Sequence, residues 1–207
     1  MPRAPPEWRR TLRRASHLVR RCDPEGLDLL FAALRWRYDT ARNAALAILT
    51  SVRPAPVPRL LRTLRYAEAA VERRSAADAL GLLRETKAGA ALLQSLEDPN
   101  MVVRRSAMVA LLRLRDGAAV TAIGRRLRDE SGGVRVLAAQ VLGELGDRRS
   151  VPPLIRSLRD SKWYVRQASA RALGKLKDRR ARSALGKART DPRLAVRNAV
   201  REALDLL

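Results

Sequence analysis

The chain has 207 residues, of which 46% are hydrophobic and 3% aromatic, and it carries 43 Lys and Arg against 21 Asp and Glu. No apolar run approaches the roughly 18 residues that a membrane-spanning helix requires. One histidine and one cysteine exclude a His- or Cys-rich metal site and an internal disulfide. The net charge of +22 favours association with nucleic acid, anionic lipid or an acidic protein surface. We expect a cytoplasmic protein, because a single cysteine is compatible with a reducing compartment.

The segment 1–21 is strongly basic, with seven arginines and one glutamate. Its apolar residues recur at i, i+4, i+7 and i+11, which is the spacing of an amphipathic helix: Trp8, Leu12, Ala15 and Val19. We expect this helix to cap the repeated units that begin at residue 22, since the ends of an array of stacked repeats need a polar outer face. A dedicated nucleic-acid-binding arm is the alternative.

Residues 22–207 consist of six units of 31 residues without insertion or deletion. Three series of positions recur in this register: Arg42, Arg73, Arg104, Arg135, Arg166, Arg197; Leu49, Leu80, Leu111, Leu142, Leu173, Leu204; and Leu30, Leu61, Leu92, Ile123, Leu154, Leu185. A fixed period between 20 and 50 residues indicates stacked supersecondary units rather than one closed core.

Each unit contains two predicted helices, A and B, and the copy at 147–177 shows them most clearly. Pro152 and Pro153 fit the first turn of helix A, where Ser150 is the expected N-cap. Helix B follows Asp160, with apolar and small residues on one face. Acidic residues recur before both helices, where they cap N-termini and need no catalytic role: Glu85, Asp98, Asp116, Asp129, Asp147, Asp160, Asp178 and Asp191.

The later units resemble HEAT repeats of the short, 31-residue, phycobilisome-lyase-like kind. The resemblance covers residues 22–207, is strongest from residue 67, and rests on the strings DPNMVVRRSAMVALLRL, DESGGVRVLAAQVLGELGD, DSKWYVRQASARALGKLKD and DPRLAVRNAVREALDLL. It implies an all-α, right-handed solenoid of about six two-helix repeats, with helix B on the concave face. It also implies a ladder between neighbouring repeats, built from Asp98/Arg104, Asp129/Arg135, Asp160/Arg166 and Asp191/Arg197. Trp36 and Ala67 replace the Asp in the first two units.

Catalysis is not expected, and neither is a cofactor. His17 is the only histidine, so the repeated His-Glu pairs of di-iron HEAT enzymes are missing. A remote alternative is resemblance to the HEAT-like DNA glycosylases, with Trp163 or Trp36 beside Asp160 or Asp39.

The expected concave face is more apolar than the rest of the surface. Helix B is predicted to expose positions 164, 167, 168 and 171, together with the positions 31 residues apart from them in the other units. For two of these positions, Val71 and Val102, packing on the adjacent repeat is the alternative. We expect an acidic or amphipathic protein segment to bind at Met101, Val102, Val109, Val136, Leu137, Trp163, Tyr164, Gln167 and Arg171.

Basic residues surround the turns from helix B to the next helix A and form a predicted edge of the solenoid: Arg113, Arg115, Arg148, Arg149, Lys175, Lys177, Arg179 and Arg180. The A helices add further cations: Arg125, Arg126, Arg128, Arg156 and Arg159. We expect a non-enzymatic binding scaffold. The alternative function is sequence-nonspecific binding of DNA or RNA phosphates at this edge. Alternatively, these basic residues lie at solvated helix ends, where they complement the helix dipole and bind no partner.

Overall fold

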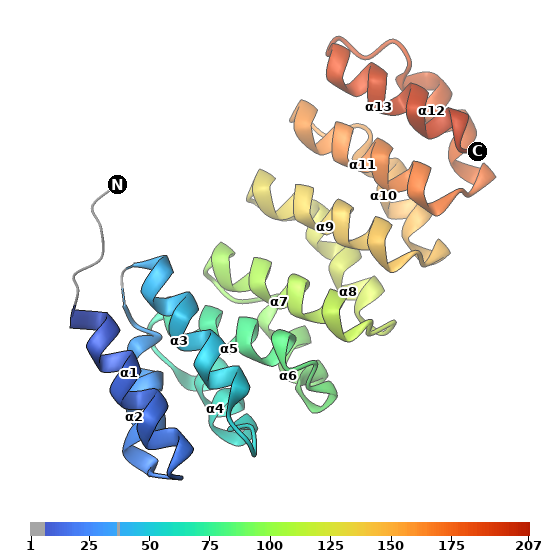
Figure 1. Cartoon of the computed structure of the whole chain (residues 1–207). Coiled ribbons are helices and arrows are strands. Elements are labelled where there is room, and N and C mark those ends of the chain that lie inside the picture. The colour runs from blue at the N-terminus through green and yellow to red at the C-terminus, as the bar shows by residue number, and fades with distance from the viewer. Residues whose placement is uncertain (1–6, 37) are drawn as a thin grey trace.

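The computed structural model describes residues 7–36 and 38–207, and its regular structure is entirely helical there (Figure 1). Odd-numbered helices are α1 (Glu7–Arg20), α3 (Asp39–Ser51), α5 (Ala70–Leu82), α7 (Met101–Leu114), α9 (Gly132–Leu145), α11 (Trp163–Leu176) and α13 (Leu194–Asp205). Even-numbered helices are α2 (Pro24–Ala33), α4 (Val57–Tyr66), α6 (Gly89–Ser95), α8 (Ala119–Arg125), α10 (Val151–Ser157) and α12 (Arg182–Ala188). Short 3₁₀ segments are η1 (Thr86–Ala88), η2 (Arg126–Arg128), η3 (Arg148–Ser150) and η4 (Arg179–Ala181).

The helices stack in two layers along a curved array, as the all-α solenoid prediction requires (Figure 1). Each unit supplies one even-numbered helix, which is helix A, and the following odd-numbered helix, which is helix B. The helices B line the inner side of the curve. Helix α1 lies 31 residues before α3, so it occupies the register of a helix B and packs against α2 and α3. Residues 1–6 of the expected capping segment lie outside the described residues.

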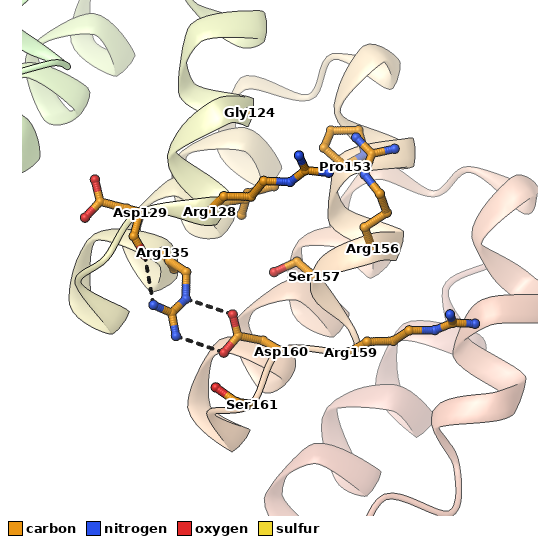
Figure 2. A pocket seen from close by; sticks show the side chains of 11 residues that line it. Gly124, Arg128, Asp129, Arg135, Pro153, Arg156, Ser157, Arg159, Asp160 and Ser161 are labelled. Atoms are coloured by element: carbon orange, nitrogen blue, oxygen red, sulfur yellow. Dashed lines mark hydrogen bonds and ion pairs between the residues drawn. The ribbon is translucent and has the colours of Figure 1, made fainter.

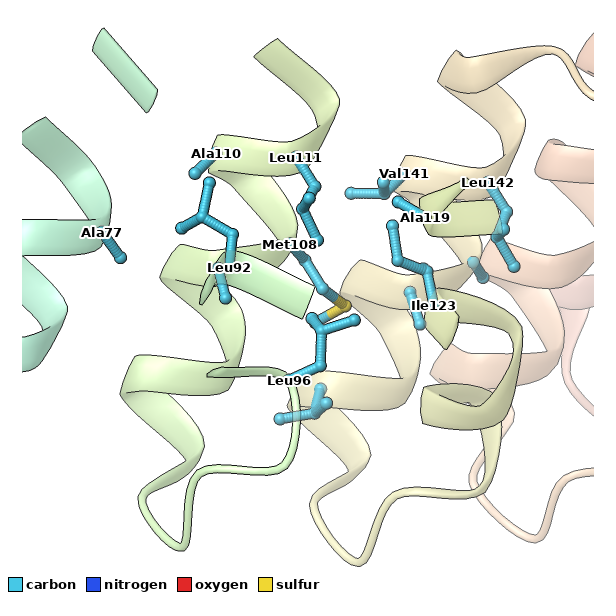
Figure 3. Packing of buried hydrophobic residues seen from close by; sticks show 14 of the residues in the cluster. Ala77, Leu92, Leu96, Met108, Ala110, Leu111, Ala119, Ile123, Val141 and Leu142 are labelled. Carbon is cyan, nitrogen blue, oxygen red and sulfur yellow. The ribbon is translucent and has the colours of Figure 1, made fainter. Parts of the chain in front are cut away.

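The recurrent leucines form one continuous core between the layers. Leu49, Leu80, Leu111, Leu142 and Leu173 are fully buried at equivalent positions of successive helices B. Figure 3 shows Leu111 and Leu142 packed with Met108 and with Leu92 and Ile123 of the facing helices A. The second unit differs by one residue, because Leu60 rather than Leu61 takes the buried position on α4. Burial of each such side chain contributes roughly 1.5–3 kcal/mol.

The recurrent acidic residues act as caps. Before helix B, carboxylates accept the backbone N–H two residues later at 2.8–3.0 Å, in Asp98, Asp129, Asp160 and Asp191. Glu85, Asp116, Asp147 and Asp178 do the same before helix A, at 2.8–3.1 Å. Ser150 occupies the predicted N-cap position of α10, but it is buried and its side chain makes no capping hydrogen bond; Asp147 instead caps the 3₁₀ turn that leads into α10.

The Asp–Arg ladder is present and crosses from one repeat to the next. Arg135 donates from Nε and Nη2 to Asp160 of the next repeat at 2.7 and 3.0 Å, and from Nη1 to the carbonyl of Asp129 in its own repeat at 2.9 Å. Equivalent ion pairs join Arg73 to Asp98, Arg104 to Asp129 and Arg166 to Asp191. Since these side chains are at most 14% exposed, the pairs tie each repeat firmly to its successor.

The first unit lacks this link. Ala67 provides no carboxylate, so Arg42 pairs with the exposed Asp39 of its own helix and donates to the Trp36 carbonyl. Burial, followed by the nearby Arg74, lowers the pKa of Arg42, whereas the hydrogen bond to Asp98 raises the pKa of Arg73. The missing aspartate therefore leaves a buried guanidinium without its inter-repeat partner.

Glycines on helices B set how closely neighbouring repeats approach. A Cβ on Gly81 would lie 2.7 Å from Ala110 Cα, and one on Gly174 would lie 2.9 Å from Ala203 Cα. Gly143 meets Ala172 in the same way at 3.0 Å. The equivalent position holds Leu112 in α7 and Thr50 in α3, and the pairs α7–α9 and α3–α5 pack less closely.

Candidate protein-binding groove

The inner face of the array carries two adjoining cavities, which together we call the B-helix groove. The first, about 560 Å³, is lined mainly by α3, α5 and α7. The second, about 520 Å³, is lined by α7, α9 and α11. Val109 and Leu137 line both cavities, so the groove runs continuously across at least five helices B.

The groove collects most of the residues predicted for the partner-binding face. Its second cavity is lined by Val109, Val136, Leu137, Tyr164, Gln167 and Arg171, and Val102 lines the first. Met101 and Trp163 do not line either cavity. They lie at the first residues of α7 and α11, on the rim, and are 47% and 38% exposed.

The second cavity lies beside the junction that lacks a glycine. Leu112 lines it together with Val141, whereas the tighter junctions carry Gly81, Gly143 or Gly174 at the Leu112 position. A leucine side chain prevents the backbone approach that a glycine allows. The wider α7–α9 junction therefore coincides with the second cavity.

Unpaired cations border the apolar floor. Arg105, Arg113 and Arg171 are exposed and have no ion pair with any described carboxylate. Lys175, by contrast, pairs with Glu144, and Arg74 lies 3.6 Å from Asp39. The groove therefore combines apolar side chains with a positive border.

One carboxylate lies inside the first cavity. Burial raises the pKa of Asp78, and the Ser106 hydroxyl, Arg74 and Arg113 act in the opposite direction. Arg74 Nε lies 3.7 Å from the Asp78 carboxylate. Asp78 thus offsets part of the positive charge of the arginines at this end, as Glu144 does beside Lys175 at the other end.

Trp163 and Tyr164 form an aromatic corner at the start of α11. Their rings meet edge to face, with centroids 5.8 Å apart and an interplanar angle of 76°. The Tyr164 ring also lies over the beginning of α9, where a Cβ on Gly132 would come within 2.5 Å of its hydroxyl oxygen. Tyr164 is therefore anchored on the neighbouring repeat and presents one side to the groove.

The structure corrects one predicted surface position and adds another. The position equivalent to 168 is buried in most repeats, as Ser75, Ser106 and Ala168 show, because it faces the neighbouring helix B. Leu82 and Arg113 line the groove one helical turn beyond the predicted stripe. Extending the i, i+4 spacing by one more turn would have found both.

The predicted basic edge is divided in the structure. Arg113 and Lys175 border the groove rather than the edge. Arg149 and Arg180 bind the Asp147 and Asp178 caps and donate to the backbone carbonyls of Gly117 and Arg148 in the preceding repeat. Arg148 lies 3.9 Å from the Asp178 carboxylate. The exposed residues without an ion pair among the described residues are Arg115, Lys177 and Arg179.

The carboxylates considered above for catalysis already take part in ion pairs. Among residues 7–36 and 38–207, no group of three His, Cys, Asp or Glu side chains could hold a metal ion. Asp160, the carboxylate beside Trp163, is bound by Arg135, and Asp39 near Trp36 pairs with Arg42. In the same part of the chain, no helix has the length and apolar character needed to cross a membrane.

Two family models match the chain. A model of HEAT repeats matches residues 120–205, and a model of the PBS lyase HEAT-like repeat matches residues 72–98. Together they cover more than half of the sequence. A search of curated proteins found no match.

Solved structures share the architecture at low sequence identity. The complex of CpcE and CpcF of phycocyanin lyase from Nostoc sp. PCC7120 is 22% identical, with a TM-score of 0.57 over 71% of this chain and 96% of that chain. A designed armadillo repeat protein in complex with the peptide (KR)4 is 17% identical, with a TM-score of 0.58 over 86% of this chain and 97% of that chain. A computationally designed armadillo repeat protein for modular peptide recognition is also 17% identical, with a TM-score of 0.59 over 86% and 98%. These likenesses show a common solenoid fold.

Proposed function

The chain belongs to the HEAT-repeat family, and we propose that it is a non-enzymatic scaffold whose B-helix groove holds an acidic, amphipathic segment of a partner protein. The observation that carries this proposal is the combination of a continuous apolar floor with unpaired arginines on its border. Apolar side chains of a partner would fill the floor between α7, α9 and α11. Its carboxylates would meet Arg105, Arg113 and Arg171.

Charge decides which kind of segment fits. The designed armadillo neighbour holds a (KR)4 peptide, which is basic. The groove of this chain is bordered by arginines, so a basic peptide would be repelled and an acidic one attracted. Arginine also binds carboxylates through two parallel hydrogen bonds, which favours Asp and Glu over other polar residues.

The aromatic corner supplies a candidate anchor. Trp and Tyr are enriched among the interface residues that contribute most to binding. Trp163 and Tyr164 are both more than a third exposed and lie at the end of the second cavity. We therefore expect an apolar residue of the partner to pack against Trp163 while its acidic residues meet Arg171 on α11 and Arg105 and Arg113 on α7.

The test uses a library of short random peptides displayed on phage and selected on the full chain. The expected result is enrichment of peptides that combine Asp or Glu with aromatic or aliphatic residues. Affinity of an enriched peptide is then measured by fluorescence anisotropy for the wild type, for Leu137→Asp, and for Trp163→Ala combined with Tyr164→Ala. Each variant should weaken binding at least tenfold, which corresponds to about 1.4 kcal/mol.

Arg182→Glu on α12 is the matched control, because Arg182 is exposed and lies outside the groove. It should leave peptide affinity within about twofold of the wild type, since screening weakens charges more than a Debye length away. Enrichment of basic peptides, or an unchanged affinity of Leu137→Asp, would contradict the proposal.

Two further parts of the proposal have their own tests. A cytoplasmic location, expected from the single cysteine, is tested by cell fractionation. The non-enzymatic assignment predicts that a bound peptide is recovered chemically unchanged, which mass spectrometry of the eluted peptide would show.

A further inference from the structure

A separate polar cavity of about 390 Å³ lies between the C-terminal ends of α8 and α10, away from the B-helix groove (Figure 2). Arg128 comes from η2, whereas Arg156 and Arg159 come from the end of α10 and the turn that follows it. Figure 2 shows Arg128 and Arg156 extending toward the same end of the cavity, near Pro153. We call these three residues the outer arginine cluster.

The outer arginine cluster is not neutralised by any acidic side chain of the described residues. Within residues 7–36 and 38–207, none of its three members forms an ion pair or a side-chain hydrogen bond. The two carboxylates that line the cavity are already bound. Asp160 accepts from Arg135, as the dashed lines in Figure 2 show, and Asp129 accepts from Arg104. The cavity is thus lined by three arginines to which the described part of the chain supplies no counter-ion; Arg128 and Arg156 end close together, and Arg159 extends toward the next repeat (Figure 2).

A buried hydroxyl lines the same cavity. Ser157 is 7% exposed, and its Oγ has no hydrogen-bond partner among the described residues. Burial of an unpaired hydroxyl costs roughly 1–3 kcal/mol relative to one that is hydrogen-bonded. The Oγ atom itself is almost fully covered, so a small rotation of the Ser157 side chain would let an acceptor oxygen in the cavity satisfy this hydroxyl as well as the guanidinium groups.

The cluster lies within a longer row of cations. Arg125, Arg156 and Lys187 occupy equivalent positions of three successive repeats, and Arg128 and Arg159 form a second such series. All five are exposed. Successive packed helices lie about 8–10 Å apart, which corresponds to about three nucleotides of a strand that rises 3.4 Å per step.

The composition of this row identifies the class of ligand. None of the exposed large hydrophobic residues of the described chain lines this cavity: Tyr66, Leu82, Met101, Trp163, Tyr164, Leu194 and Leu206. A membrane surface or a peptide would be expected to bury apolar side chains here. A ligand that is recognised by charge and hydrogen bonding alone needs no apolar side chains on the protein.

We propose that the outer arginine cluster binds the phosphodiester backbone of nucleic acid, without reading its sequence. Arginine matches phosphate oxygens through paired N–H donors. One phosphate occupies the cavity between Arg128 and Arg156 and accepts a hydrogen bond from Ser157, and neighbouring phosphates follow the row toward Lys187. This site is independent of the groove and does not rest on the peptide proposal.

The test measures fluorescence anisotropy of labelled DNA and RNA duplexes of ~20 base pairs at about 50 and 200 mM salt. The cluster variant combines Arg128→Gln, Arg156→Gln and Arg159→Gln. It should lower affinity at least tenfold at low salt. It should also reduce the slope of log K against log salt by roughly 0.9 for each phosphate that the variant no longer neutralises.

A matched variant removes the same number of charges from the other edge, through Arg115→Gln, Lys177→Gln and Arg179→Gln. These residues are exposed and form no ion pair with any described residue, so the net charge falls equally. Its affinity should stay within about threefold of the wild type, because charges more than a Debye length from the bound phosphates are largely screened and contribute little. Ser157→Ala, which preserves charge, should weaken binding several-fold.

Equal decreases in affinity for the two triple variants would overturn the proposal, because net charge alone would then explain binding. No detectable duplex binding by the wild type at low salt, or binding only to phosphatidylserine vesicles, would overturn it as well. Wild-type affinity of Ser157→Ala would remove the cavity as the point of phosphate binding. Leu137→Asp in the groove should bind duplexes normally, which separates this result from failure of the peptide proposal.

Discussion

The close approach of helices B at glycine predicts that Gly81→Ala destabilises the protein. The new Cβ would lie 2.7 Å from Ala110 Cα and 2.8 Å from Ala110 Cβ, and the first of these is a backbone atom that cannot move alone. Overpacking of this kind costs about 1–3 kcal/mol. Alanine recovers roughly 0.5–1 kcal/mol through its higher helix propensity. The free energy of unfolding should therefore fall by about 1–2 kcal/mol.

Gly186→Ala is the matched comparison, because a Cβ there meets no atom within 4 Å. Only the gain in helix propensity remains, so this variant should be more stable by roughly 0.5–1 kcal/mol. Thermal and urea unfolding followed by circular dichroism measures both. For a chain of this length each kcal/mol shifts Tm by about 2–4 °C. Equal or greater stability of Gly81→Ala than wild type would refute a backbone-limited packing of α5 on α7.

Two further predictions concern the ion pairs. Arg104→Met leaves the nearly buried Asp129 without its partner and should cost about 3–5 kcal/mol in urea unfolding, whereas Arg42→Met, whose partner is exposed, should cost clearly less. The opposite order would contradict the inter-repeat role of the ladder. Hydrogen bonds from the side chain and backbone of Arg180 lower the pKa of Asp178 to about 2. A depressed carboxyl pKa stabilises the fold above the unfolded value near 4, and this contribution should disappear as the pH falls from about 4 to 2. Carboxyl NMR titration should show the Asp178 midpoint near 2 in the wild type and nearer 4 in Arg180→Gln; an unchanged midpoint would rule out this cause.

Much of the fold follows from local patterns in the sequence. The 31-residue register identified the helix pairs, the buried leucines and the eight capping carboxylates, because each depends on residues within one repeat. The ladder partners depend on a neighbouring repeat: Arg104 pairs with Asp129, 25 residues later, and in its own repeat it donates to the carbonyls of Asp98 and Pro99. The family resemblance was needed to expect a link between repeats.

The candidate sites were harder to predict because they depend on which charges find partners. Arg149 and Arg180 look free in the sequence, but the fold gives each a carboxylate and a carbonyl of the preceding repeat. Arg128 and Arg156 look just as free in the sequence. In the structure they find no carboxylate among the described residues, because the nearby Asp129 and Asp160 are already bound by the ladder arginines. The unsatisfied hydroxyl of Ser157 corresponds to no sequence pattern at all.

Backbone conformation also departs from what residue types suggest. A residue one or two positions after helix B is left-handed in five repeats, with φ between 49° and 72°: Cys22, Arg84, Arg115, Gly146 and Lys177. These positions share the 31-residue register, but only Gly146 is a glycine. Left-handed backbone is disfavoured for side chains other than glycine and asparagine, so sequence alone predicts this turn only once.

The break in the ladder at Ala67 has a consequence for how the protein unfolds. The junction between the first and second units is crossed by more exposed ion pairs such as Arg59–Asp28 and Arg74–Asp39, but it lacks the buried ladder carboxylate and carries Thr50 in place of the close-packing glycine. In a solenoid each repeat is held only by its neighbours, so two weakened interface terms at one junction lower the cooperativity across it. Helices α1, α2 and α3 should therefore open as a unit before the rest of the array, with faster amide hydrogen exchange than α5 to α11. A single substitution, Ala67 in place of the aspartate, is thus expected to mark the boundary between two cooperative folding units.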